Sequence, residues 1–206
     1  MARKRKAKIM QKILKVQYFT QLDNYGQEDR TCNSSACWGG AIYMKSSLLA
    51  NAGFDDNSDW SFYLPRVEDI GDTTDHNAQT EALRKLGVES TWRTNLTIEA
   101  VTAEIDQGRP VVIGFLHKGP SDAPFGFGHI ILVIGYEKDS NSAVIALIVN
   151  DSYGECNLVD GGYKGMPECG AGLRYSVKNM RPRFECDDAG YPAPGCGYGR
   201  IFAPNK

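Results

Sequence analysis

Three long apolar runs in the second half of the chain set the strongest limit on what it can fold into. The runs are VVIGFL (111–116), HIILVIGY (129–136) and AVIALIVND (143–151), and loops rich in glycine and polar residues separate them. Near-continuous runs of β-branched residues are typical of strands that are covered on both faces. The sequence therefore predicts a buried sheet, with a shorter strand at 173–177 followed by an irregular, glycine-rich tail.

Helical patterns come earlier in the chain. The predicted helices run from Asn33 to about Ala50, from a cap at Thr74 or Asp75 to Gly87, and from a cap at Thr97 to Gly108. A strand is predicted over residues 15–23, with Gln21 near its end. Because the helices precede the main strands, the order favours an α+β fold over an alternating β-α-β fold.

The 206 residues suit a single globular domain, because a chain of this length can bury a sizeable core. Charge is unevenly distributed along it: residues 1–22 carry seven Lys and Arg and no acid, although the formal net charge of the whole chain is −2. The rest of the sequence is therefore acidic, which argues against a nucleic-acid-binding domain. We predict a basic N-terminal arm at residues 1–15, which contacts an anionic surface or is a solvated tail, and one domain at residues 16–206.

The sequence shows no targeting segment. The basic arm is not followed by the apolar segment and small-residue cleavage site of a secretory signal. No run reaches the roughly 18 apolar residues that a membrane span needs. We therefore expect synthesis in the cytoplasm without a signal peptide, and no stable insertion into a membrane.

The segment EDRTCNSSACWGGAIYM (28–44) places Cys32 at the start of the first predicted helix, after a charged loop. A cysteine attacks well only as a thiolate, and a helix N-terminus and a neighbouring imidazolium both favour that form. Cys37 lies one to two turns further along, on the apolar face, which is typical of a small core residue. We predict Cys32 as a nucleophile; the alternative is an ordinary buried cysteine.

A nucleophilic cysteine needs a base, and the chain has three histidines. His129 begins the most apolar strand, after APFGFG, where glycines leave room for another group to approach. We predict His129 as the base; the alternative is a histidine that is satisfied at the rim of the sheet. His76, in the first turn of a polar helix, is predicted to be a surface or capping residue, and His117 to lie in a loop at the end of a strand.

A third group should accept a hydrogen bond from the second imidazole nitrogen. Asp151 closes the strand that follows the His129 strand, and an antiparallel pair joined by the short EKDSNS turn would bring the two side chains together. Asn150 is the alternate, but its side chain should point to the opposite face of the sheet. The Asn-Asp pair is also consistent with the start of a turn.

An amide donor is needed for the oxyanion that develops during acyl transfer. Gln21 closes the predicted strand before the Cys32 loop, whereas Gln27 lies inside that loop, where it is less well held. We therefore predict Gln21 as the oxyanion donor.

The site is predicted to need no metal and no cofactor. Phosphate-binding glycine loops are absent from the sequence, and no Cys-x-x-Cys pair supports a zinc site. The segment DDNSD (55–59) resembles the start of a calcium loop, but Trp60 occupies the glycine position and Arg66 the position of the closing glutamate. Disulfides are an alternative for the four C-terminal cysteines, Cys156, Cys169, Cys186 and Cys196.

These segments together resemble a known family. The order YFTQLDN…CNSSA…GHIILVIGY…VNDSYG is similar to that of papain-like cysteine peptidases of the double-glycine peptidase superfamily, which are related to the bacteriocin leader peptidases. The segments GDTTDHNAQTEALRKLGV, TNLT, GRPVVIGFLHKGP and SVKNMRPRF further resemble a phage-borne branch regarded as endolysins. The resemblance runs from about Val16 to Phe202.

The resemblance implies a papain-like α+β fold, in which a central nucleophile helix packs on an antiparallel sheet. It also implies a hydrolase, a cysteine protease with a Cys32–His129–Asp151 triad, in which Gln21 donates to the oxyanion. The chain departs from the leader peptidases at the nucleophile, where it has Cys-Asn-Ser in place of Cys-Gly-Pro. This departure argues against a double-glycine leader as the substrate.

The endolysin-type branch implies peptidoglycan degradation and phage-driven cell lysis, with a stem peptide or cross-bridge as the substrate. The enzyme would be made in the host cytoplasm and would act at the cell envelope or as part of a virion, and the basic arm is consistent with an anionic envelope. Two alternatives stay open. One is a peptidase that matures another protein, and the other is a catalytically silent virion or wall-binding protein that keeps the peptidase fold.

Overall fold

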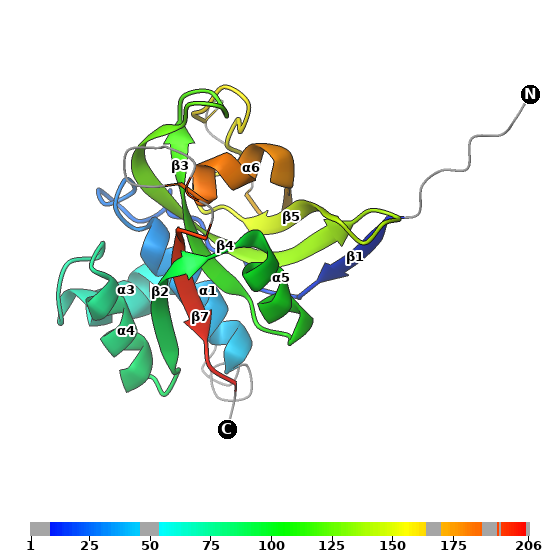
Figure 1. Ribbon diagram of the computed structural model, residues 1–206. Helices are drawn as coiled ribbons and strands as arrows, with labels where there is room; N and C mark the ends of the chain where they lie inside the picture. The colour runs from blue at the N-terminus through cyan, green and yellow to red at the C-terminus, as the bar shows by residue number, and fades with distance from the viewer. Residues whose placement is uncertain (1–8, 46–53, 164–169, 187–192, 194, 205–206) are drawn as a thin grey trace, which may run out of the picture.

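The computed structural model describes residues 9–45, 54–163, 170–186, 193 and 195–204. One antiparallel sheet forms its centre, with the strand order β2-β7-β3-β4-β5-β6 and with β1 paired to β4 (Figure 1). The strands are β1 (Met10–Ile13), β2 (Ser90–Leu96), β3 (Val111–Lys118), β4 (Phe125–Lys138), β5 (Val144–Asn150), β6 (Leu173–Ser176) and β7 (Gly197–Phe202).

Helices cover both faces of this sheet. The chain forms α1 (Cys32–Met44), the π-helix η2 (Asp59–Tyr63), α3 (Leu64–Glu68), α4 (His76–Lys85), α5 (Ile98–Asp106) and α6 (Val177–Phe184). The first four pack on one face, against residues such as Val112 and Leu132, while α5 and α6 pack on the other face, against Ile113 and Val149 (Figure 1). The predicted double coverage and the α+β class are confirmed. Successive side chains of a strand point to opposite faces of the sheet, so an unbroken apolar run is buried on both.

The antiparallel pairing of β4 with β5 brings distant positions together, as predicted. Leu132 lies opposite Asn150, so the chain leaves β5 beside the half of β4 that holds His129. On its other side β4 pairs with β3, where Phe115 lies opposite His129. Residue 129 is therefore flanked by the end of β3 and by the turn that follows β5.

The two capped helices are confirmed. Asp75 caps α4 and Thr97 caps α5, each by accepting a backbone N–H of the first turn with its side-chain oxygen. Gly87 and Gly108 follow these helices with φ values of 73° and 77°. Only glycine adopts this left-handed conformation without strain, so both positions stop a helix for the predicted reason.

The N-terminal strand and the first helix differ from the prediction. Residues 15–23, predicted as a strand, are irregular, and the N-terminal strand is β1. Val16 and Phe19 pack against the core without joining the sheet. The alternation of apolar and polar residues in this segment therefore reflects burial of its side chains and not pairing of a strand. The first helix ends at Met44, and the predicted end at Ala50 lies outside the described residues.

The irregular C-terminal tail is also wrong for residues 197–202, which form β7 between β2 and β3. The sequence does not predict this strand, because the glycines of GYGRIF lower its strand propensity. In the sheet they are required: Gly199 lies too close to the backbone of β3 to carry a side chain. The ring of Tyr198 lies across Gly114 and Gly128, where a β-carbon would overlap it.

The division into an arm and a domain stays a prediction. β1 falls within residues 1–15 and pairs with the end of β4, while residues 1–8 lie outside the described part of the chain. None of the described helices has both the length and the apolar character that a membrane span requires.

Candidate active site

Cys32 is the first residue of α1, and its side chain is half-buried. Thr31, immediately before it, has a non-helical backbone, with φ −107° and ψ 5°. The backbone N–H groups of a first helical turn have no partners within the helix and point out of its N-terminus. The sulfur of Cys32 therefore lies at the positive end of the helix dipole.

His129 lies in the first half of β4 with only 7% of its side chain exposed. Its Nε2 is 2.8 Å from Oδ1 of Asp151, a fully buried carboxylate directly after β5. Because Nε2 is engaged in this way, Nδ1 is the nitrogen that remains for another partner. Cys32 lines the same cleft as His129 and contributes to its pKa, so the three side chains lie in the order Cys32, His129, Asp151.

The environment of His129 acts on its protonation in two directions. Burial lowers the pKa of the imidazole, because the charged form loses hydration. The Asp151 carboxylate and then Cys32 oppose this effect through charge and hydrogen bonding, and the pKa of His129 is raised above its ordinary value. The ring is therefore held as an imidazolium over a wider range of pH.

Asp151 is held by further donors. The hydroxyl of Tyr175 donates to Oδ2 at 2.7 Å, that of Tyr163 donates to Oδ2 at 3.1 Å, and the backbone N–H of Tyr153 donates to Oδ1 at 3.1 Å. Burial and the nearby carboxylate raise the pKa of Tyr163 and Tyr175, so both phenols stay protonated. The sequence does not predict Tyr163 and Tyr175 as site residues.

Gln21 is buried in the same region and lines one cleft with Cys32 and His129. The hydroxyl of Ser152 donates to its Oε1 at 2.6 Å, which turns the amide nitrogen toward the loop before α1. There Nε2 donates to the backbone carbonyl of Glu28. Since an amide nitrogen carries two hydrogens, one N–H of Gln21 remains for another acceptor.

The alternates Asn150 and Gln27 are engaged elsewhere. Asn150 accepts the backbone N–H of Gly172 at 3.0 Å, and this is consistent with a side chain on the opposite face from Asp151. Gln27 donates to the carboxylate of Glu68 at 2.9 Å.

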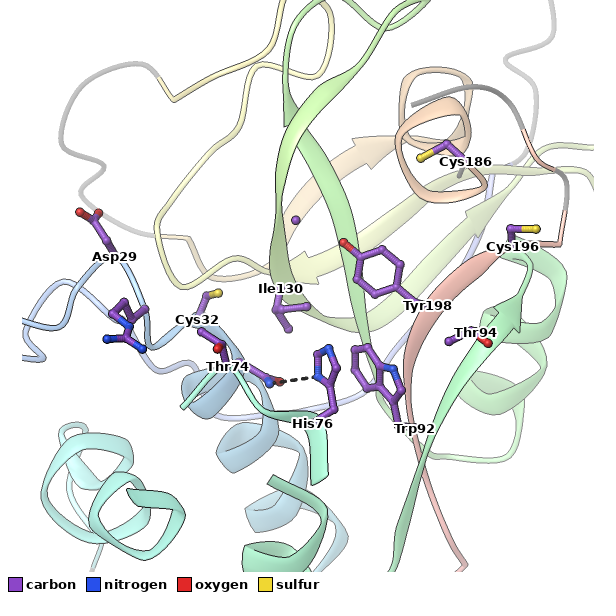
Figure 2. Close-up of a pocket in the computed structure, with 13 residues that line it drawn as sticks. Asp29, Cys32, Thr74, His76, Trp92, Thr94, Ile130, Cys186, Cys196 and Tyr198 are labelled. Carbon is purple, nitrogen blue, oxygen red and sulfur yellow. Dashed lines mark hydrogen bonds between the residues drawn. The ribbon is translucent and has the colours of Figure 1, made fainter. Parts of the chain in front are cut away.

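Two clefts meet at Cys32. Asp29, Cys32 and Gly128 line both of them. The smaller cleft, of about 610 Å³, is also lined by Gln21, His117, His129, Tyr153 and Tyr163. The larger, of about 780 Å³, is also lined by His76, Trp92, Ile130, Cys186, Cys196 and Tyr198 (Figure 2). An extended chain that lies across both clefts would pass over the sulfur.

The sequence itself carries a family signature. Residues 13–164 match the model of the Peptidase_C39 like family. The chain belongs to this family. The matched range contains Gln21, Cys32, His129 and Asp151. No curated protein sequence gave a match.

A solved structure supports the fold of this C39-like chain. It is similar to the crystal structure of a candidate C39-like peptidase from Bacillus anthracis, with a TM-score of 0.56 and 12% sequence identity. The similarity covers 96% of this chain and 99% of that chain. At such low identity the likeness concerns the fold alone, and it agrees with the predicted papain-like α+β class.

His76 lies in the wall of the larger cleft of the C39-like domain, which the sequence does not predict. Its ring stacks on Trp92 with centroids 3.4 Å apart, and its Nδ1 is 3.4 Å from Nδ2 of Asn33, the residue after Cys32 (Figure 2). Burial, and then the charge of Arg200, lowers the pKa of His76 to about 4. The ring is therefore neutral at pH 7 and accepts a hydrogen bond from Asn33.

Cys37 is a core residue, as predicted. It is fully buried, its thiol donates to Oδ1 of Asn33 at 3.4 Å, and burial raises its pKa. Cys156 and Cys196 are free thiols, and no disulfide joins any two of the described cysteines. Cys169 lies outside the described residues.

Within the described ranges, no three His, Cys, Asp or Glu side chains converge in a way that could hold a metal ion. The DDNSD segment (55–59) runs into η2 instead of forming the helix-flanked loop of an EF-hand.

Proposed function

We propose that the protein is a cysteine peptidase that hydrolyses an amide bond through Cys32, His129 and Asp151. The observation that carries this proposal is the buried hydrogen bond of 2.8 Å between His129 and Asp151, in the wall of a cleft that also contains Cys32. Membership of the Peptidase_C39 like family supports it. In this arrangement Asp151 accepts a hydrogen bond from Nε2 of the imidazole, and Nδ1 is the nitrogen that exchanges a proton at the Cys32 side.

The reaction begins with attack of the Cys32 thiolate on the substrate carbonyl while His129 is protonated. The C–S bond forms, and an electron pair of the carbonyl moves onto its oxygen. The positive end of α1 and the remaining N–H of Gln21 stabilise this oxyanion. Gln21 is suited to this role because Ser152 and Glu28 hold its amide in one orientation.

The tetrahedral intermediate then collapses. The C–N bond breaks, and Nδ1 of His129 gives its proton to the leaving amine. The neutral imidazole next takes a proton from a water molecule, whose oxygen attacks the thioester. Release of the acid restores the thiolate, and the proton on Nδ1 restores the imidazolium. The Asp151 carboxylate accepts the hydrogen bond from Nε2 and stabilises the imidazolium; no step needs a metal or cofactor.

The proposed substrate is a peptide of peptidoglycan, either the stem peptide or the cross-bridge, and the proposed biological role is that of a phage endolysin. The sequence segments shared with the endolysin-type branch support this substrate. The two clefts that meet at Cys32 leave room for a chain on both sides of the sulfur. The proposed place of action is the cell envelope, reached from the cytoplasm or delivered with a virion.

Zymograms test the substrate class. The purified protein is run in parallel on gels that contain purified cell walls and gels that contain casein, and we expect clearing of the cell walls only. Mass spectrometry of the released muropeptides then identifies the bond from the new amino terminus. Clearing of casein alone would favour a protein-maturation peptidase, and binding to walls without clearing would favour a silent wall-binding protein.

Two variants test the mechanism. Cys32→Ala and His129→Ala should each lower the rate of wall hydrolysis by at least about 10²-fold, because each removes a group that forms or breaks a bond. Cys37→Ala, a buried cysteine on the same helix, is the matched control and should keep most of the activity. Lysis that persists in both active-site variants would show that the mechanism is wrong.

A further inference from the structure

The two clefts at Cys32 contain different catalytic groups, and this difference gives the substrate a direction. His129 and Gln21 line the smaller cleft but not the larger one, whereas Cys32 lines both. In the proposed mechanism Nδ1 of His129 protonates the leaving amine, so the part of the substrate that leaves must lie on the His129 side, in the smaller cleft. The acyl part extends from the same carbonyl carbon in the other direction, into the larger cleft.

Three half-buried rings lie together along the larger cleft (Figure 2). His76, at the start of α4, stacks on Trp92 of β2 with centroids 3.4 Å apart, and the Trp92 ring is 5.9 Å from that of Tyr198 in β7. We call these three residues the aromatic cluster. Ile130 of β4 adds an aliphatic side chain to the same cleft. Ligand-binding pockets are lined mainly by aromatic and apolar side chains of this kind.

Buried contacts hold the aromatic cluster in place. The fully buried guanidinium of Arg200 lies 5.8 Å from the centre of the Trp92 ring and donates to the backbone carbonyl of His76 at 2.8 Å. The side chain of Tyr198 occupies the space above Gly114 and Gly128, where a β-carbon would overlap its ring or its hydroxyl. Because these rings are already fixed, little conformational entropy is lost when a ligand binds to them.

Charge in the larger cleft is confined to the end next to the nucleophile. Among the described residues that line this cleft, the charged ones are Asp29 and Arg30, in the loop directly before Cys32, and Arg30 forms an ion pair with Asp72. Burial lowers the pKa of His76 to about 4, so this ring adds no charge at pH 7. A charged group of the substrate that lay against the aromatic cluster would lose its hydration without gaining a partner of opposite charge.

We propose that the aromatic cluster is the subsite for the acyl part of the substrate, and that it selects an uncharged, apolar residue there. This inference rests on the proposed function, and it narrows the substrate to peptide bonds whose acyl side carries such a residue. Tyr198 lies outside residues 13–164, the range that matches the family model. The subsite is therefore completed by a strand that the family signature does not cover.

Peptidyl chloromethyl ketones test the selectivity of the wild type. The Cys32 thiolate displaces chloride from such a reagent, so a C–S bond forms as the C–Cl bond breaks, and the peptide of the reagent occupies the acyl side. The three reagents carry an acetylated dileucyl, diglutamyl or dilysyl peptide. Modification of Cys32 is followed by mass spectrometry of peptide fragments, because Cys196 is also exposed in the larger cleft. We expect kinact/KI to be higher for the dileucyl reagent than for either charged reagent by about tenfold or more.

Four variants test whether the aromatic cluster causes this selectivity. Tyr198→Ala and Trp92→Ala each remove one ring, and each should raise KI for the dileucyl reagent by about fivefold or more with little change in kinact. If one of these two variants does not fold, the other makes the same test. Tyr198→Phe keeps the ring and should keep the selectivity. Tyr25→Ala removes an exposed ring that lines neither cleft, so it is the matched control and should react as the wild type does.

Iodoacetamide separates the subsite from the reactivity of the thiol. This reagent has no peptide part, so it should modify Cys32 at the wild-type rate in every variant. A ring variant that loses reactivity toward iodoacetamide and toward the dileucyl reagent in equal proportion would contradict a role of its ring in binding the acyl part.

Two further results would overturn the subsite. One is a wild type whose Cys32 reacts with the three peptidyl reagents at equal rates, or faster with a charged reagent. The other is a pair of ring variants that keep the wild-type preference. Cell-wall hydrolysis is a separate readout. Hydrolysis that needs Cys32 but is accompanied by no preference among the reagents contradicts the subsite alone, whereas a clear preference together with hydrolysis that persists in Cys32→Ala contradicts the proposed function alone.

Discussion

At the scale of single residues, the proposed chemistry depends on how one buried carboxylate is held. Asp151 accepts hydrogen bonds from His129, from the phenols of Tyr163 and Tyr175, and from a backbone N–H. With its acceptor sites occupied, the carboxylate has one orientation and so has the imidazole that it binds. The charge of Asp151 also reverses the effect of burial on the pKa of His129.

Asp151→Asn tests that charge. Burial alone lowers the pKa of His129, so loss of the carboxylate should move the alkaline limb of the kcat/KM profile to lower pH by about 1–3 units. Stability follows the same sign: a raised histidine pKa stabilises the fold at low pH, and this contribution is lost as pH rises through the folded-state pKa. The stability of the wild type should therefore exceed that of Asp151→Asn most below the folded-state pKa of His129. An unchanged alkaline limb would contradict this account of His129.

Tyr175→Phe and Tyr163→Phe test the two phenols. A hydrogen bond to a charged group contributes about 1.5–3 kcal/mol, and the Tyr175 bond to Asp151 is the shorter, at 2.7 Å against 3.1 Å. Tyr175 also accepts the buried backbone N–H of Cys156 at 2.8 Å, which its removal leaves unpaired. We expect Tyr175→Phe to lower both Tm and kcat/KM more than Tyr163→Phe does. Equal losses in thermal unfolding and steady-state kinetics would contradict this ranking.

At the scale of the elements, α1 is positioned by close contact with the sheet. Gly39 lies against Leu132 of β4 and the carbonyl of Gln17, and Gly40 lies against the ring of Phe202 in β7. The two glycines lower the intrinsic stability of the helix, but they let its backbone approach the strands. The approach fixes where the N-terminus of α1, and hence Cys32, lies relative to β4.

Gly40→Ala should be destabilising although alanine is the better helix former. A β-carbon at this position overlaps the ring of Phe202, and overpacking of this kind costs about 1–3 kcal/mol, more than the gain of about 1 kcal/mol in helix propensity. Gly39→Ala is the comparison, since its β-carbon would lie 3.2 Å from a flexible Leu132 methyl group and 3.3 Å from a carbonyl. Thermal unfolding should give a lower Tm for Gly40→Ala than for Gly39→Ala; the opposite order would contradict the close packing described here.

At the scale of the whole molecule, the two ends of the chain contribute differently to the sheet. β1 pairs with β4 at the periphery of the sheet and leaves Met10 46% and Ile13 47% exposed. β7 is central, between β2 and β3, and its Arg200 is fully buried. That guanidinium donates to the backbone carbonyl of His76 at 2.8 Å and to two hydroxyls, which joins β7 to the wall of the larger cleft.

Two truncations compare these ends. Removal of residues 1–13 takes away β1 but keeps the buried Leu14, and the protein should still unfold cooperatively with a Tm lowered by a few degrees. Removal of all residues from Gly197 onward opens the sheet between β2 and β3, so we expect loss of near-UV circular dichroism and of cooperative unfolding. Cooperative unfolding of the C-terminal truncation at the wild-type Tm would contradict a central role for β7.

The sequence by itself determined the features that depend on a few adjacent residues. The caps at Asp75 and Thr97, the glycine stops and the apolar runs of β3, β4 and β5 are local signals, because each reflects backbone preference or one periodicity. The same holds for Cys32 at the start of a helix. The meeting of His129 with Asp151 followed from a short turn between two antiparallel strands, which is also a local argument.

Only the tertiary structure decided what depends on residues far apart in the chain. Tyr163 and Tyr175 converge on Asp151 from separate segments, and His76 reaches the larger cleft by stacking on Trp92. β7 carries no periodic apolar signal, because its glycines are selected by the neighbours that crowd them. The places of these side chains and of β7 depend on which surfaces of the protein pack together. The free energy of that packing comes from many contacts between residues that are far apart in the sequence.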